Sequence, residues 1–168
     1  MNSLALRPGD IFLSKNPMAL GKAINAVQRF WAKDSHSIYS HAGIIIDEAG
    51  TTYESLWRVK SQNLFEAYKD DQVLIARHEN MLPGAFHYAF EHIRQEHDND
   101  FYPFYRLTFH LFPPIAKLCT NSVVCSELVA KFLHYLDMFP YYNGANPDNL
   151  HDHIKWAKGW QIIYEGKV

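Results

Sequence analysis

The segment Ser122–Ala130 constrains this chain most, because it places a cysteine where an apolar helical pattern begins. Asn121 or Ser122 can cap such a helix, since either side chain can accept a hydrogen bond from a free amide of the first turn. The apolar residues that follow recur at three- and four-residue spacing, as on one buried helical face: Leu128, Val129, Phe132, Leu133 and Leu136. We therefore predict that Cys125 lies in the first turn of a buried helix.

A cysteine at the start of a helix has two interpretations. The positive end of the helix dipole favours the thiolate and can lower a cysteine pKa from ~8.5 to roughly 3.5–7.5, which makes the thiol a nucleophile at neutral pH. Free cysteine is also among the most buried residue types, so Cys125 can simply be a small apolar residue packed at the helix start. The segment alone leaves both interpretations open.

Thiol catalysis needs a base that holds the thiolate as an ion pair and later protonates the leaving group. Residues 39–46, Tyr-Ser-His-Ala-Gly-Ile-Ile-Ile, have the composition of a buried strand that is entered through His41. An imidazole at the mouth of a strand can be held rigidly. His41 is therefore our candidate base.

The base needs a third group to orient it, and Glu54 is our candidate. Glu54 lies in a second predicted strand, residues 51–59, after the turn 47–50. If the loop between the strands is even-numbered, antiparallel pairing puts Glu54 on the same sheet face as His41 and Gly43; an odd loop turns it away. A charge in such a stretch is costly unless it is partnered, although a solvated strand residue is the alternative interpretation.

The remaining patterns predict an α+β fold in which helices pack on an antiparallel sheet. The predicted elements are a strand at 11–13, helices at 20–31 and 84–97, a strand at 72–77, a short helical turn at 146–150 and a strand at 160–164. Residues 98–114 are aromatic and punctuated by proline, and they indicate no regular structure. The length of 168 residues fits a single domain spanning residues 1–168.

Charge and composition exclude several classes of protein. A net charge of −2 argues against a nucleic-acid-binding surface, which needs a basic stripe. Residues 1–13 lack the pattern of a signal peptide, and no apolar run approaches the ~20 residues of a transmembrane helix, so we expect a cytoplasmic protein. Cys119 and Cys125 are too close in sequence to be bridged without distorting the helix start, so we predict two free thiols, with Cys119 in the core.

The ten histidines raise the question of a metal site. His151 and His153 lie on one side of a short segment, and His92 shares a helical face with Glu96. Neither pair belongs to a His-Glu-x-x-His pattern or to a Cys/His ligand set. We therefore expect neither a metal nor another cofactor.

The chemistry-bearing motifs, taken together and in their order, resemble the permuted branch of the NlpC-type papain-like superfamily, in particular YiiX-like proteins. Ordinary members have the cysteine helix before the histidine strand, whereas here the histidine comes first. The matching motifs, from residue 8 to about 150, are Pro8-Gly9-Asp10-Ile11, Ser40-His41-Ala42-Gly43-Ile44, Tyr53-Glu54, Cys125-Ser126-Glu127-Leu128-Val129 and Asn146-Pro147-Asp148-Asn149-Leu150.

The resemblance implies a small, circularly permuted papain-like fold with a Cys125–His41–Glu54 triad. It implies a hydrolase or acyltransferase, most similar to peptidases and amidases, that attacks an amide or ester carbonyl and forms a thioester. The implied substrate is a small peptide, amide or lipid-like molecule. The Cys125 backbone amide would meet the oxyanion; Tyr39 could be the second donor, although a packed core tyrosine is the alternative.

The chain departs from the family pattern at one place. Family members often carry a Tyr-Asp pair ahead of the cysteine, whereas this chain has Asp100-Phe101-Tyr102-Pro103. The difference falls in the expected substrate-facing wall, residues 98–114. Since a fold does not guarantee activity, a binding module that keeps the fold and holds a lipid or peptide without turnover is the alternative function.

Overall fold

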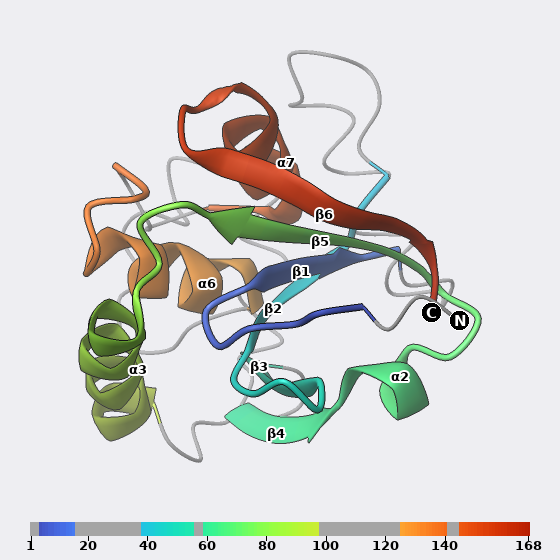
Figure 1. Cartoon of the computed structure of the whole chain (residues 1–168), viewed down its shortest axis with the longest axis horizontal. Coiled ribbons are helices and arrows are strands. Elements are labelled where there is room, and N and C mark those ends of the chain that lie inside the picture. The colour runs from blue at the N-terminus through green and yellow to red at the C-terminus, as the bar shows by residue number, and fades with distance from the viewer. Residues whose placement is uncertain (1–3, 16–37, 56–58, 98–124, 141–144) are drawn as a thin grey trace, which may run out of the picture.

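The computed structural model describes residues 4–15, 38–55, 59–97, 125–140 and 145–168. Within these ranges the chain forms one six-stranded sheet of order β4-β3-β2-β1-β5-β6, with every neighbouring pair antiparallel (Figure 1). The strands are β1 (Ile11–Ser14), β2 (His41–Ile45), β3 (Thr51–Ser55), β4 (Val59–Asn63), β5 (Gln72–His78) and β6 (Trp160–Lys167). The helices are α2 (Leu64–Ala67), α3 (Pro83–His97), α6 (Cys125–His134) and α7 (Pro147–Trp156). This is the predicted α+β arrangement of an antiparallel sheet packed with helices.

The two faces of the sheet carry different cores because side chains alternate along each strand. One face packs against α3, α6 and α7 and forms the larger core, with Leu13 and Ile44 among its strand residues. The other face carries a smaller core that includes Phe12 and Ile45. Since Phe12 pairs with Gly43 across β1 and β2, His41 and Gly43 belong to this second face.

The apolar periodicity identified two of the helices correctly. The predicted helix at 84–97 corresponds to α3, and the cysteine helix corresponds to α6, which begins at Cys125. Four of the five predicted apolar positions are fully buried in α6. Burial of each of these side chains stabilises the fold by roughly 1.5–3 kcal/mol. Leu136 lies beyond the helix end but still packs against the core. The predicted helix at 20–31 and residues 98–114 lie outside the described residues.

The predicted strand at 51–59 is wrong in its extent. β3 ends at Ser55, and Val59 begins a separate strand, β4, which pairs antiparallel with β3. β4 is an edge strand whose Lys60 and Ser61 are exposed, so it lacks the apolar alternation that identifies a strand in sequence. It forms because the backbone of β3 offers it a pairing partner.

Two C-terminal elements are longer than predicted. The expected short turn after Asn146 is the ten-residue helix α7, with Pro147 in its first turn. The Asn146 side chain accepts a hydrogen bond from the Asn149 amide at 2.8 Å, and the Asn149 side chain accepts from the Asn146 amide, so the two form a capping box. The last strand continues to Lys167 because it pairs with β5 along that whole length.

An ion pair between a buried aspartate and a partly exposed arginine fixes the entry into β1. Asp10 is buried and accepts two hydrogen bonds from the Arg77 guanidinium, both at 2.7 Å. Its Oδ2 also accepts from the Arg7 amide at 2.8 Å, and Gly9 supplies the positive φ of 91° that the turn requires. The Pro-Gly-Asp turn therefore positions the central strand on which β2 and its histidine pack.

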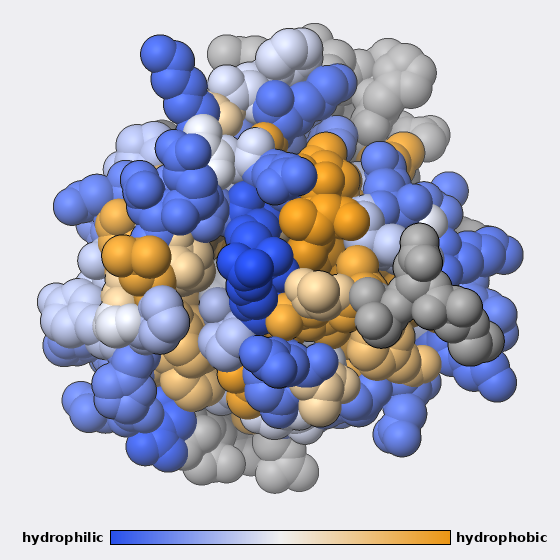
Figure 2. All heavy atoms as spheres, viewed as in Figure 1, coloured by the Kyte–Doolittle hydropathy of each residue, from blue (hydrophilic) through white to orange (hydrophobic). Residues whose placement is uncertain are grey.

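The apolar surface of the described residues lies partly on the edge strand β6. Figure 2 shows hydrophobic residues gathered over the middle of β6 with hydrophilic residues beside them, and Ile162 of this strand is exposed. β2, by contrast, is buried along its entire length. Among the described residues, no helix has the length and hydropathy needed to cross a bilayer. The cytoplasmic location and the absence of nucleic-acid binding stay predictions from the sequence.

Candidate active site

The register of β2 and β3 puts Glu54 on the face that carries His41. Ile44 pairs with Tyr53, and the Ile46 amide donates to the Thr51 carbonyl at 2.8 Å, which leaves an even-numbered loop, Asp47–Gly50, between the strands. Glu54 therefore lies opposite Gly43. Gly43 is two residues after His41 on β2, so all three residues lie on the same face of the sheet. The even-loop register that the sequence analysis considered is confirmed.

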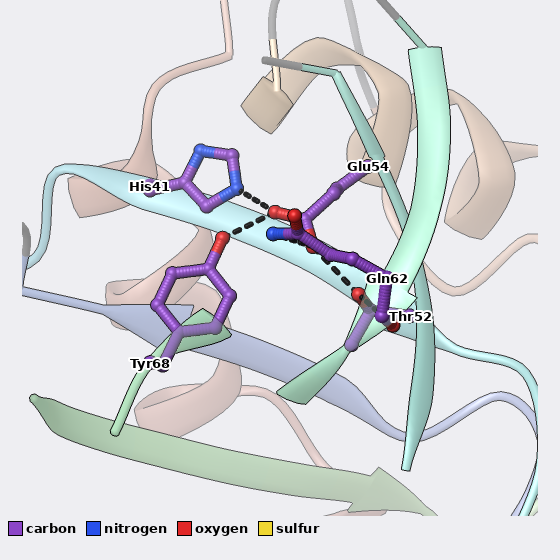
Figure 3. Close-up of polar contacts among 5 residues, drawn as sticks. All are labelled: His41, Thr52, Glu54, Gln62 and Tyr68. Atoms are coloured by element: carbon purple, nitrogen blue, oxygen red, sulfur yellow. Dashed lines mark hydrogen bonds and ion pairs between the residues drawn. The ribbon is translucent and has the colours of Figure 1, made fainter. Parts of the chain in front are cut away.

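Glu54 is a buried carboxylate that accepts four hydrogen bonds (Figure 3). Its Oε2 accepts from His41 Nε2 at 2.5 Å and from the Tyr68 hydroxyl. Its Oε1 accepts from Thr52 Oγ1 at 2.6 Å and from Gln62 Nε2 at 2.9 Å. Burial alone would raise the pKa of Glu54, but His41 and the other donors hold it below its ordinary value. At 0% exposure, Glu54 is not the solvated strand residue of the alternative interpretation.

Cys125 is buried at the first position of α6. Burial would raise the pKa of the Cys125 thiol, but the charge of His41, together with hydrogen bonding to His41 and to the backbone of Ala42 and Ser126, lowers the pKa below the ordinary value. The Ser126 hydroxyl donates to the Ala145 carbonyl at 2.8 Å and so ties down the first turn of the helix.

His41 lies between the thiol and the carboxylate. Burial favours the neutral ring, but the Cys125 thiolate and the Glu54 carboxylate outweigh it and raise the pKa of His41 to about 10. Nε2 is engaged by Glu54, and the second ring nitrogen points away from Glu54 in Figure 3, so Nδ1 is the atom left for Cys125. An imidazolium can donate through both nitrogens, which fits a thiolate on one side and a carboxylate on the other.

The other three donors to Glu54 are not among the site residues predicted from the sequence. Thr52 lies two residues before Glu54 on the same strand face, so period-two alternation could have found it. Gln62 comes from β4, which the sequence did not predict as a separate strand. Tyr68 follows α2 as its C-cap residue, and no motif marks it.

The sequence leaves two roles open for Tyr39, a donor to the oxyanion and a packed core tyrosine. Its ring is buried, and its hydroxyl donates to Glu165 Oε1 at 2.8 Å. Burial and this carboxylate raise the pKa of Tyr39. Because the hydroxyl is already committed to Glu165, the position fits the core alternative.

The histidine pairs weighed as metal ligands have other partners. His153 Nε2 is hydrogen-bonded to the Met138 carbonyl at 2.7 Å, and the His92 ring stacks on Tyr135. Across the part of the chain that the structure describes, no group of three or more His, Cys, Asp or Glu side chains is arranged to hold a metal ion. Cys119 lies outside these residues.

We predict that Gly43→Ala disturbs the site through packing. An added Cβ would lie 2.4 Å from Phe12 Cε1 and 3.1 Å from Glu54 Cβ, so both side chains must shift. We expect the free energy of unfolding, measured in urea, to fall by about 1–3 kcal/mol, as is usual for an overpacked core. We also expect Cys125 to be alkylated more slowly at mildly acidic pH. Gly84→Ala is the matched control, because no heavy atom lies within 4 Å of its added Cβ. Equal stability of the two variants would contradict the packing argument.

Comparison with known proteins relates this chain to solved structures. No family model and no curated protein matches this chain. Among solved structures, the metalloprotein yiiX from Escherichia coli O157:H7 (DUF1105) matches with a TM-score of 0.64 at 15% sequence identity. The match covers 98% of this chain and 99% of the yiiX chain. The chain therefore has a yiiX-like α+β fold.

Proposed function

We propose that this chain is a circularly permuted, papain-like member of the NlpC-type superfamily and a cysteine-dependent hydrolase or acyltransferase. The observation that carries the proposal is the position of His41, whose imidazole is hydrogen-bonded to a buried carboxylate and whose charge lowers the pKa of the buried Cys125 thiol. The chain order, with the histidine strand before the cysteine helix, and the yiiX-like fold add support. The proposed substrate is a small peptide, amide or lipid-like molecule with an amide or ester carbonyl.

In the proposed mechanism, the Cys125 thiolate attacks the carbonyl carbon and forms a carbon–sulfur bond. The negative charge that develops on the carbonyl oxygen is met by the Cys125 backbone amide. The carbon–nitrogen or carbon–oxygen bond then breaks, and His41 gives its Nδ1 proton to the leaving group. Water or another acceptor, deprotonated by His41, resolves the thioester. Glu54 stays ionised and orients the imidazole throughout.

The name of yiiX raises the question of a metal at this site, and the donor set does not fit one. Both oxygens of Glu54 are occupied by four hydrogen-bond donors, and His41 Nε2 is bonded to Glu54 itself. The charge of His41 lowers the pKa of the Cys125 thiol, so the sulfur already interacts with the imidazole. Since a metal ligand must direct a free lone pair at the ion, binding here would require breaking these contacts. The proposed mechanism therefore uses no metal.

The test is covalent trapping of the acyl group. Activated acyl esters and anilides, from short peptidyl to long fatty acyl, are incubated with the protein in the presence of a chelator, and intact mass is recorded over time. We expect an acyl adduct at Cys125 that decays as product forms, and loss of both in Cys125→Ala but not in Cys119→Ala. Binding of these compounds without an adduct or turnover would overturn the proposal that the protein is an enzyme and would favour the alternative of a binding module.

A further inference from the structure

We propose that Tyr68 is a positioning residue that holds Glu54 and His41 in the orientation in which Nδ1 faces Cys125. This inference rests on the proposed function and deepens it, because it adds a residue to the machinery of the same site. The action of Tyr68 would pass through the two side chains that it touches, Glu54 and His41.

A single side chain contacts both members of the Glu54–His41 pair. The Tyr68 hydroxyl donates to Glu54 Oε2, the same oxygen that His41 Nε2 contacts. The Tyr68 ring lies nearly parallel to the imidazole, at an interplanar angle of 19° and a centroid separation of 5.9 Å. Figure 3 shows the Tyr68 hydroxyl directed at the Glu54 carboxylate and the Tyr68 ring beside the imidazole. We infer that the first contact fixes the carboxylate and that the second limits rotation of the imidazole.

Phe12 holds the Tyr68 ring in this position. Its ring centroid lies 5.1 Å from that of Tyr68 and 6.0 Å from that of His41, so it packs against both rings. Phe12 is fully buried, and Tyr68 is 5% exposed. A side chain wedged in this way has few alternative rotamers, which is what a positioning group requires.

The other two donors to Glu54 act differently. Thr52 and Gln62 both contact Oε1, the oxygen that does not contact the imidazole. Within the described residues, Tyr68 is thus the donor to Glu54 that also packs on His41. Thr52 and Gln62 are expected to support the carboxylate without constraining the ring.

The charges around the carboxylate give the expected pH effect its sign. Glu54 faces His41 from β2 and Tyr68 from the end of α2, and its cross-strand neighbour on β4 is the exposed Lys60. Burial and Glu54 raise the pKa of Tyr68, so its hydroxyl stays protonated and donates throughout the working pH range. Removing this donor leaves the buried carboxylate less stabilised and raises the pKa of Glu54. The carboxylate and the imidazole also lose the contact that orients them, so the imidazolium faces the thiolate less well and the midpoint of thiolate formation moves to higher pH.

The experiment compares Tyr68→Phe, which keeps the stacked ring, with Tyr68→Leu, which loses ring and hydroxyl. The rate of Cys125 alkylation is measured against pH, and kcat and KM are measured on the best acyl ester. For Tyr68→Phe we expect a higher alkylation midpoint and a kcat lower by roughly 10-fold, as is typical when an outer partner of an orienting group is removed, with little change in KM. Tyr68→Leu should be more severe in both respects.

Tyr164→Phe is the matched control. It removes a tyrosine hydroxyl that donates to the Lys167 carbonyl on the edge strand β6. It should leave the midpoint and kcat unchanged, and thermal unfolding of each variant checks folding. If the pH midpoint of Cys125 alkylation in Tyr68→Phe equals that of the wild type, Tyr68 is not a positioning residue, while the proposed function stands. An ordinary thiol midpoint in the wild type would instead overturn the proposed function.

Discussion

His41→Ala is expected to slow alkylation of Cys125 at mildly acidic pH by about 100-fold or more, as loss of a catalytic acid–base partner typically does. In the wild type the imidazolium beside the sulfur lowers the pKa of the Cys125 thiol against the effect of burial. Without that charge only the backbone amides oppose burial, so the thiolate forms at a higher pH. The measurement is the second-order rate constant for iodoacetamide across a pH series, in a Cys119→Ala background.

His87→Ala is the matched control for this prediction, because His87 is an exposed histidine on α3. Its alkylation profile should coincide with that of the wild type. If His41→Ala also coincides with the wild type, the thiol is not activated by the imidazole, and the interpretation of Cys125 as a packed core residue is the better one.

Glu54→Gln is expected to lower the free energy of unfolding by about 3–5 kcal/mol at neutral pH, the usual loss when one member of a buried ion pair is removed. The carboxylate is buried and accepts four hydrogen bonds, whereas an amide offers one acceptor oxygen and presents an NH₂ group to donors. His41 also loses the charge that helps to raise its pKa. Urea unfolding of both proteins measures the difference.

The pH dependence of this difference follows from the direction of the Glu54 shift. The pKa of Glu54 in the folded protein lies below its ordinary value of 4.5, so its contribution is present above that pH and disappears as the pH falls through the folded pKa. The pKa of His41 rises from 6.5 to about 10, so the imidazolium contributes fully below pH 6.5 and loses its contribution between these two values. The difference in the free energy of unfolding between the wild type and Glu54→Gln should therefore become smaller at acidic pH and at alkaline pH.

Glu91→Gln provides the surface comparison. Glu91 pairs with Arg94 one helical turn away on α3, at 3.1 Å and with both side chains substantially exposed. Such a pair contributes about 0–1 kcal/mol, so this variant should unfold almost as the wild type does. A Glu54→Gln protein as stable as Glu91→Gln would show that the hydrogen bonds around Glu54 do not carry the expected energy.

The parts of the site that the sequence could predict are those governed by chain periodicity. The apolar repeat of α6 puts Cys125 at the start of this helix. The alternation of side chains along β2 and β3 puts Glu54 on the same sheet face as His41 when the loop between the strands is even-numbered. The fold class followed from the same patterns. The order of the motifs along the chain added the resemblance to a permuted family, of which the fold match supports the yiiX-like fold alone.

The parts that could not be predicted depend on contacts between elements. β4 is a polar edge strand, so Gln62 has no pattern that assigns it to the site. Tyr68 reaches Glu54 only because the chain turns back through α2, and its aromatic ring looks in sequence like any other core residue. Residues that satisfy a buried charge are chosen by tertiary geometry, which local sequence does not encode.

The central claim is that Cys125 and His41 form a thiolate–imidazolium pair, and the most direct measurement is a titration of thiolate ultraviolet absorbance in Cys119→Ala. The account predicts that the thiolate forms below the ordinary thiol pKa and that the His41 imidazolium persists toward pH 10. The same titration in Cys125→Ala should show no such transition. A Cys125 thiolate that forms only at or above the ordinary thiol pKa would contradict the account.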